Sequence, residues 1–199
     1  MLWRHGQTVW NAERRFQGQS DIPLDETGQA QAGRAARLLA ALHPDLIVSS
    51  DLSRAAQTAA PLAHLTGLEV TLDKDLRERS GGVWEGLTDT EIRERYPRER
   101  ASWDPPGGEP TSVVADRMSG AINRVAAGLE PGQLAVVVSH GAALRIGMER
   151  VLGLPAEGIG VLGPLANCSW SVLSVVDDHW RLLEYNAGTL PEPVIGDDR

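Results

Sequence analysis

Two histidines and two arginines are the residues in this chain whose types and spacing could do chemistry. Arg4 and His5 follow an apolar start, and Gly6 lets the backbone turn or approach a ligand closely. His140 stands directly after the apolar run LAVVVS, and Arg54 comes shortly after the run LIVSS. Arginine forks match phosphate oxygens, and a neutral imidazole can act as a nucleophile. These residues therefore indicate a site that binds and transfers a phosphoryl group.

The chemistry also needs a group that protonates the leaving oxygen. The segment LRERSGGVWEGLT offers Glu78 and Glu85 beside a Gly-Gly turn, and both are candidates. The pKa of such an acid must be raised by burial or by the negative charge of the substrate. Arginines repel cations, and a metal site would favour carboxylates or cysteines beside the histidines. The sequence therefore predicts no metal and no cofactor.

The elements that position these residues follow from the hydrophobic pattern. Apolar runs and alternation predict strands at residues 1–3, 45–50, 68–73, 134–139, 169–176 and 180–186. Helical spacing predicts helices at residues 26–43, 51–66 with a break at Pro61, 88–96, 111–129 and 140–153. Strands that alternate with helices predict a three-layer α/β/α sandwich with a mainly parallel central sheet. We expect one domain over residues 1–190 and a flexible tail over residues 191–199.

The predicted sheet brings the candidate residues together. In parallel sheets, ligands bind beyond the carboxyl ends of the strands. Arg4, His5, Arg54 and His140 all follow such ends, so we expect them to converge on one edge. Gly141 lies at the following strand-to-helix junction, where backbone amides can bind an anion.

Composition limits the partners. The net charge of −8 argues against non-specific nucleic-acid binding, which needs a basic face. The apolar runs are too short to span a membrane, and no leader pattern precedes residue 20, so we expect a cytoplasmic protein. The single cysteine, Cys168, is interpreted as a small buried residue. We interpret His43, His64 and His179 as surface or helix-end histidines.

Five segments in order resemble one known family. RHGQTVWN, RFQGQSDIPLDETGQAQA, SSDLSRAAQTA, LRERSGGVWEGLT and VVVSHGAALR resemble the blocks of the histidine phosphatase superfamily, which includes the cofactor-dependent phosphoglycerate mutases. The resemblance spans nearly the whole chain. It implies an α/β sandwich that acts on a small phosphorylated substrate through a phosphorylated histidine, without a metal.

The resemblance also implies roles for particular residues. His5 matches the phosphorylated histidine, Glu78 matches the acid, and Arg4, Arg54 and His140 match the groups that bind the phosphoryl. Glu85 is then expected to fix the turn. The further phosphate or substrate contacts that we expect are Asn11, Arg15, Gln17, Gly18 and Gly141. Trp84 and Trp103 are interpreted mainly as packing residues that could also touch the substrate.

Segment lengths and late segments refine the expected activity. The stretch from WEGLT to PPGGEP has no room for the insertion of the mutases, which favours a phosphatase. GPLANCSW and WRLLEYN resemble actinobacterial members that hydrolyse glucosyl-3-phosphoglycerate. Pro110 after GGE and the Gly pair in RSGGVWEG depart from that pattern near the expected entrance to the substrate site, which puts the identity of the substrate in doubt.

The alternative functions are a broad-specificity acid-type phosphatase, a cofactor-dependent mutase and an inactive member that binds a phosphorylated ligand. A homodimer is expected from the same resemblance.

Overall fold

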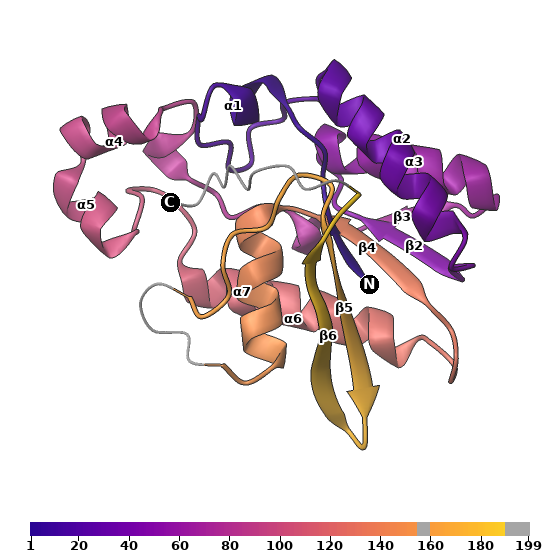
Figure 1. The fold of residues 1–199 in the computed structure, drawn as a ribbon. Coiled ribbons are helices and arrows are strands. Elements are labelled where there is room, and N and C mark those ends of the chain that lie inside the picture. The colour runs from indigo at the N-terminus through magenta and orange to yellow at the C-terminus, as the bar shows by residue number, and fades with distance from the viewer. Residues whose placement is uncertain (155–159, 190–199) are drawn as a thin grey trace.

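The structure is a computed structural model that describes residues 1–154 and 160–189. Within these residues the strands form one six-stranded sheet in the order β3-β2-β4-β1-β5-β6 (Figure 1). The strands are β1 Leu2–Arg4, β2 Leu46–Ser49, β3 Val70–Leu72, β4 Ala135–Ser139, β5 Trp170–Val176 and β6 His179–Ala187. The predicted tail of residues 191–199 lies outside the described residues, and the single domain stays a prediction.

The strands that precede the candidate residues run parallel. β1 pairs with β4 so that Arg4 lies beside Ser139, and β2 pairs with β4 so that Ser49 lies beside Val138. β5 runs antiparallel to β1, and β6 runs antiparallel to β5. The expectation of a mainly parallel sheet is confirmed. These registers bring the carboxyl ends of β1, β2 and β4 to one edge.

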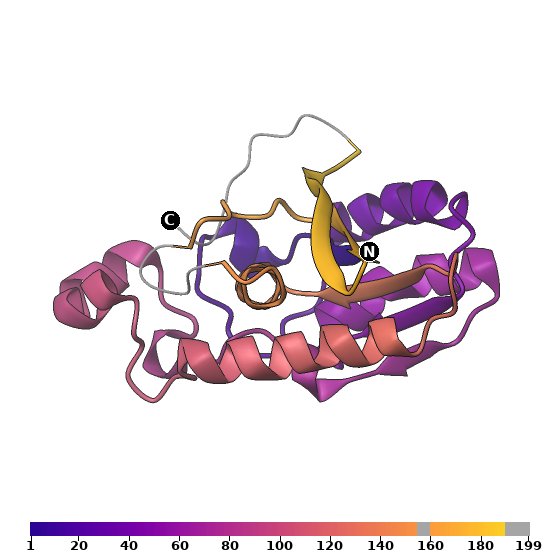
Figure 2. The same ribbon diagram turned by 90° about the horizontal axis from the view of Figure 1, so that it is seen from below.

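Helices cover both faces of the sheet, and Figure 2 shows the long helix α6 along one side of the molecule. The helices are α1 Val9–Ala12, α2 Glu26–Ala40, α3 Ser53–Thr66, α4 Asp89–Arg95, α5 Pro97–Ser102, α6 Thr111–Ala127 and α7 Gly141–Val151, with 3-10 turns η1 Lys74–Leu76 and η2 Gly82–Trp84. In the described part of the chain, no helix is long and apolar enough to cross a membrane.

Alternation along the strands divides the apolar core into two layers. Val136 and Val138 of β4 face one cluster, in which α2 and α3 pack, while Val137 faces the other, in which α6 and α7 pack. Successive side chains of a strand point to opposite faces, so a strand buried on both faces is apolar throughout. The three-layer α/β/α sandwich is confirmed.

The structure corrects three details of the predicted helices. α3 continues through Pro61, because Ala59 and Leu62 on either side are fully buried and this packing outweighs the local cost of proline. α2 ends at Ala40, which leaves Leu42 exposed instead of on the buried face. α5 was not predicted, and Pro97 at its first turn is a helix-start residue that the pattern contained.

Burial on α2 predicts a large difference between two adjacent leucines. Leu39 is completely buried, while Leu38 beside it is 52% exposed. Leu39→Ala should lower the free energy of unfolding by about 2–5 kcal/mol through lost burial and a cavity. Leu38→Ala removes the same atoms from solvent and should cost under about 0.5 kcal/mol. Urea denaturation measures both, and equal losses would contradict the described packing of α2.

Candidate active site

Residues at or just after the carboxyl ends of β1, β2 and β4 line a small cavity, together with residues of two loops. Its volume is about 30 Å³. The lining residues are Arg4, His5, Phe16, Gln17, Gly18, Arg54, Glu78, Gly141 and Ala142. The convergence of segments far apart in the sequence therefore follows from the parallel sheet, as its topology predicts.

His5 is a buried and neutral imidazole. Its Nδ1 lies 2.7 Å from the carbonyl oxygen of Gly6, so Nδ1 carries the proton and donates to that oxygen. Burial lowers the pKa of His5 well below its usual value, and the positive charges of Arg54 and Arg4 lower it further. The lone pair of Nε2 is therefore available at neutral pH, which makes His5 suited to act as a nucleophile.

Arg54 lies on the first turn of α3, with its guanidinium buried at the cavity. Its Nη2 and Nη1 donate to the carbonyl oxygens of Gly18 and Ser20 at 2.7 and 2.8 Å. Its Nε donates to Nδ1 of His140 at 3.1 Å. Burial lowers the pKa of Arg54 to about 10, so the group remains a cation at neutral pH. A fixed cation beside His5 can hold the charge of a phosphoryl group.

His140 lies behind Arg54 and does not line the cavity. Because Nδ1 accepts from Arg54, the ring proton is on Nε2, which lies 2.9 Å from Oγ of Ser50. Burial and the charge of Arg54 lower the pKa of His140 well below its usual value. In this structure His140 orients Arg54, and the predicted contact between His140 and a phosphate stays a prediction.

Glu78 reaches the cavity from the loop after η1. Its carboxylate accepts from the backbone N–H groups of Arg79, Ala142 and Ala143 at 2.8, 3.2 and 2.8 Å. Two of these donors are the first amides of α7, where the helix dipole favours a negative charge. These amides therefore bind the Glu78 side chain instead of an external anion, and Gly141 is the residue of this junction that lines the cavity.

Glu85 holds the loop that carries three cavity residues, Phe16, Gln17 and Gly18. Its carboxylate accepts from the backbone N–H groups of Gln19, Ser20 and Gly81, at 2.9 to 3.0 Å. Gly18 lies against this carboxylate with φ of +53°, so any side chain there would be strained and would collide with Glu85. Glu85 does not line the cavity, which favours the structural role over the acid role.

Of the residues predicted to contact phosphate or substrate, Gln17 and Gly18 line the cavity, while Asn11 and Arg15 do not. Arg15 donates to the carboxylate of Glu13 and to the carbonyl oxygen of Gly86 instead. Asn11 caps α1, with its Oδ1 accepting from the backbone N–H of Thr8 at 3.0 Å. A substrate contact from either residue is not supported by this arrangement.

Three aromatic residues at and beside the cavity form a cluster. Phe16 lines the cavity and contacts Trp84 and Trp103, with ring centroids 5.8 and 6.1 Å away. Trp84 is completely buried and therefore packs instead of touching a substrate, while Trp103 is half-buried. Sequence reasoning missed Phe16 and Ala142 at the cavity, although each lies directly beside a residue that it selected.

The remaining histidines, the cysteine and a second cavity lie outside this edge of the sheet. His43, His64 and His179 are exposed, and Cys168 is buried, as the sequence predicts. A larger cavity of about 390 Å³ lies at the opposite end of the sheet, between α6 and the β5–β6 hairpin, and its lining is mainly aliphatic. Among residues 1–154 and 160–189, no three His, Cys, Asp or Glu side chains gather where they could hold a metal ion. The smaller cavity is therefore the candidate active site.

The chain is similar to known proteins over most of its length. The family model of the histidine phosphatase superfamily (branch 1) matches residues 1–188. A glucosyl-3-phosphoglycerate phosphatase from Mycolicibacterium vanbaalenii is 38% identical, with 94% of this chain and 93% of that protein covered. A probable phosphoglycerate mutase from Cronobacter sakazakii is 41% identical, with 90% and 86% covered. A solved mycobacterial glucosyl-3-phosphoglycerate phosphatase is 40% identical, with a TM-score of 0.87 and 94% and 98% covered.

The two buried imidazoles should be neutral and should carry their protons on different nitrogens. The pKa of each is lowered, so between about pH 7 and 6 we expect no protonation of the folded rings, whereas unfolded histidines titrate near about 6.5. Nitrogen NMR should show Nδ1–H for His5 and Nε2–H for His140. Because the unfolded chain then binds more protons, stability should fall as the pH drops through this range. Protonated rings at pH 6 in the folded protein would contradict the assignment.

Proposed function

The chain belongs to the histidine phosphatase superfamily (branch 1), and we propose that it hydrolyses phosphomonoesters through a phosphohistidine formed on His5. Its family and its relatives make it a phosphoric monoester hydrolase. The observation that carries the proposed mechanism is the neutral His5, which is held by the Gly6 carbonyl and lines the same cavity as Arg4, Arg54 and Glu78.

In the first step, Nε2 of His5 attacks the phosphorus atom. A nitrogen–phosphorus bond forms and the bond between phosphorus and the leaving oxygen breaks. Arg4 and Arg54 hold the negative charge of the transferring group, since both guanidinium groups are buried at the cavity. Carbonyl oxygens fix both of them: Leu165 accepts from Arg4, and Gly18 and Ser20 accept from Arg54.

Glu78 supplies the proton of this step. Its carboxyl group gives the proton to the leaving oxygen, which departs as an alcohol. The negative charge of a bound phosphomonoester favours the protonated form of the neighbouring carboxyl, while the amides of Ala142 and Ala143 keep its position. Water then attacks the phosphohistidine, Glu78 takes a proton from it, and phosphate and free His5 are released. The step needs no metal, because the arginines neutralise the charge.

The substrate that we propose is glucosyl-3-phosphoglycerate. Support comes from the mycobacterial relatives, which carry that name and resemble this chain over more than nine-tenths of its length. The Cronobacter relative favours a second candidate, a phosphoglycerate mutase, in which a substrate hydroxyl instead of water takes the phosphoryl group. A broad-specificity phosphatase is a third candidate. A homodimer and a cytoplasmic location stay predictions.

The nucleophile assignment predicts the effect of His5→Ala. Removal of the imidazole should lower phosphate release by about a thousandfold or more, because no neighbouring group can form the covalent intermediate. The exposed His64 gives a matched control, and His64→Ala should keep the wild-type rate. Both are measured with p-nitrophenyl phosphate in EDTA. Near-normal turnover by His5→Ala would refute the phosphohistidine, and loss of activity in EDTA would refute metal independence.

The substrate assignment predicts strong discrimination. We expect kcat/KM for glucosyl-3-phosphoglycerate to exceed that for 3-phosphoglycerate, sugar phosphates and p-nitrophenyl phosphate by about two orders of magnitude, or ~3 kcal/mol. Comparable values across the panel would indicate a broad-specificity phosphatase. Conversion between phosphoglycerate isomers in the presence of a bisphosphorylated cofactor would indicate a mutase.

A further inference from the structure

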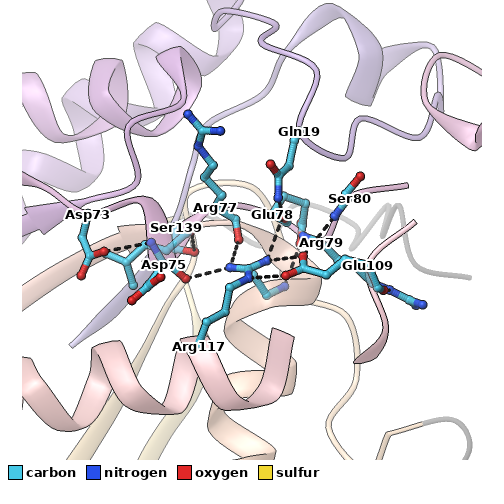
Figure 3. Close-up of polar contacts among 12 residues, drawn as sticks. Gln19, Asp73, Asp75, Arg77, Glu78, Arg79, Ser80, Glu109, Arg117 and Ser139 are labelled. Atoms are coloured by element: carbon cyan, nitrogen blue, oxygen red, sulfur yellow. Dashed lines mark hydrogen bonds and ion pairs between the residues drawn. The ribbon is translucent and has the colours of Figure 1, made fainter. Parts of the chain in front are cut away.

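Arg117 is a half-buried arginine that the proposed reaction does not use. It lies on α6 and does not line the cavity, and its side chain is only 14% exposed. Its guanidinium makes five hydrogen bonds, which equals its number of N–H donors (Figure 3). An arginine with every donor used holds its acceptors in one geometry, so the identity of those acceptors decides what Arg117 does.

Three of the acceptors are backbone carbonyl oxygens of the segment that carries Glu78. Nη1 donates to Asp75 and Arg77 at 2.7 and 2.6 Å, and Nη2 donates to Glu78 at 3.1 Å. The carbonyl oxygen of Leu76 accepts from Oγ of Ser139 at 2.7 Å. Four successive carbonyl groups, from η1 and the loop that follows it, are therefore bound by two side chains.

The other two acceptors are the oxygens of one carboxylate. Nε and Nη2 of Arg117 donate to Oε1 and Oε2 of Glu109, both at 2.7 Å, in a bidentate pair. Glu109 is tied to the same loop, because its backbone N–H donates to the Ser80 carbonyl and its own carbonyl accepts from Nε of Arg79. Glu109 thus fixes the plane in which the Arg117 fork meets the Glu78 segment.

Resting on the proposed role of Glu78 as the acid, we propose that Arg117, aligned by Glu109, is a positioning residue that holds the Glu78 carboxyl at the leaving oxygen. The side chain of Glu78 is held by the amides of α7, while its backbone is held by Arg117 from α6. Displacement of this backbone would move the carboxyl relative to the cavity. Misplacement of a catalytic group by about 1 Å can cost about a hundredfold in rate.

The test compares two substrates that differ in their need for an acid. Phenyl phosphate and p-nitrophenyl phosphate have similar rings, but p-nitrophenolate is the weaker base and leaves more readily without a proton. Arg117→Lys keeps the charge and loses the planar fork. We expect it to lower kcat/KM for phenyl phosphate about tenfold more than for p-nitrophenyl phosphate. kcat/KM reports the step in which the leaving group departs, so later hydrolysis of the phosphoenzyme does not obscure the comparison.

Arg124 offers a matched control on the same helix. It donates to the side-chain carboxylates of Asp73 and Asp75 at the surface, and it contacts none of the carbonyl groups that Arg117 binds. Arg124→Lys should leave the ratio of the two kcat/KM values unchanged. Glu109→Gln is a second test variant, which keeps the shape of the Glu109 side chain and removes its charge. It should shift the ratio in the same direction as Arg117→Lys, and it tests the proposal by itself if Arg117→Lys fails to fold.

Glu78→Gln separates the proposed acid role of Glu78 from the proposed positioning role of Arg117. It should shift the substrate ratio by itself, and Arg117→Lys added to it should cause no further shift, because Arg117 acts through Glu78. No shift in Glu78→Gln would refute the acid assignment of the proposed function. A shift in Glu78→Gln but none in Arg117→Lys or Glu109→Gln would overturn this inference alone. Equal losses for both substrates in the Arg117 and Glu109 variants would show a merely structural role and would also overturn it.

Discussion

The burial of the Arg54 guanidinium is the constraint on which the arrangement of the site depends. A buried cation is costly unless hydrogen-bond acceptors surround it. The carbonyl oxygens of Gly18 and Ser20 and the imidazole of His140 provide these acceptors. Because the acceptors come from the loop before α2 and from the end of β4, satisfying one charge fixes that loop against the sheet. Ser50 completes the arrangement by setting which nitrogen of His140 is free to accept.

The same charges both bind the proposed substrate group and prepare the nucleophile. Arg4 and Arg54 lower the pKa of His5, in addition to the larger effect of burial, and so keep Nε2 unprotonated. They also give a chain with a net charge of −8 a local site that attracts an anion. Binding of a phosphomonoester would offset the positive charge, which connects substrate binding to the protonation of Glu78 on the other side of the cavity.

The site is built largely from irregular segments, and side chains replace the hydrogen bonds that a regular element would provide. Glu85 binds the amides of Gln19, Ser20 and Gly81, and Arg117 binds the carbonyl groups of Asp75, Arg77 and Glu78. Buried backbone groups need partners, so these two side chains determine the path of both loops.

The sequence by itself determined the sandwich, the mainly parallel sheet and the edge where Arg4, His5, Arg54 and His140 meet, because periodicity and chain order decide which strand ends coincide. It did not determine local helix limits such as the passage of α3 through Pro61, where core packing outweighs propensity. Only the tertiary structure placed His140 behind Arg54 and the α7 amides on Glu78, and directed Arg15 away from the cavity. Such contacts depend on side-chain directions and on hydrogen-bond satisfaction between distant segments, and residue type and spacing do not encode these.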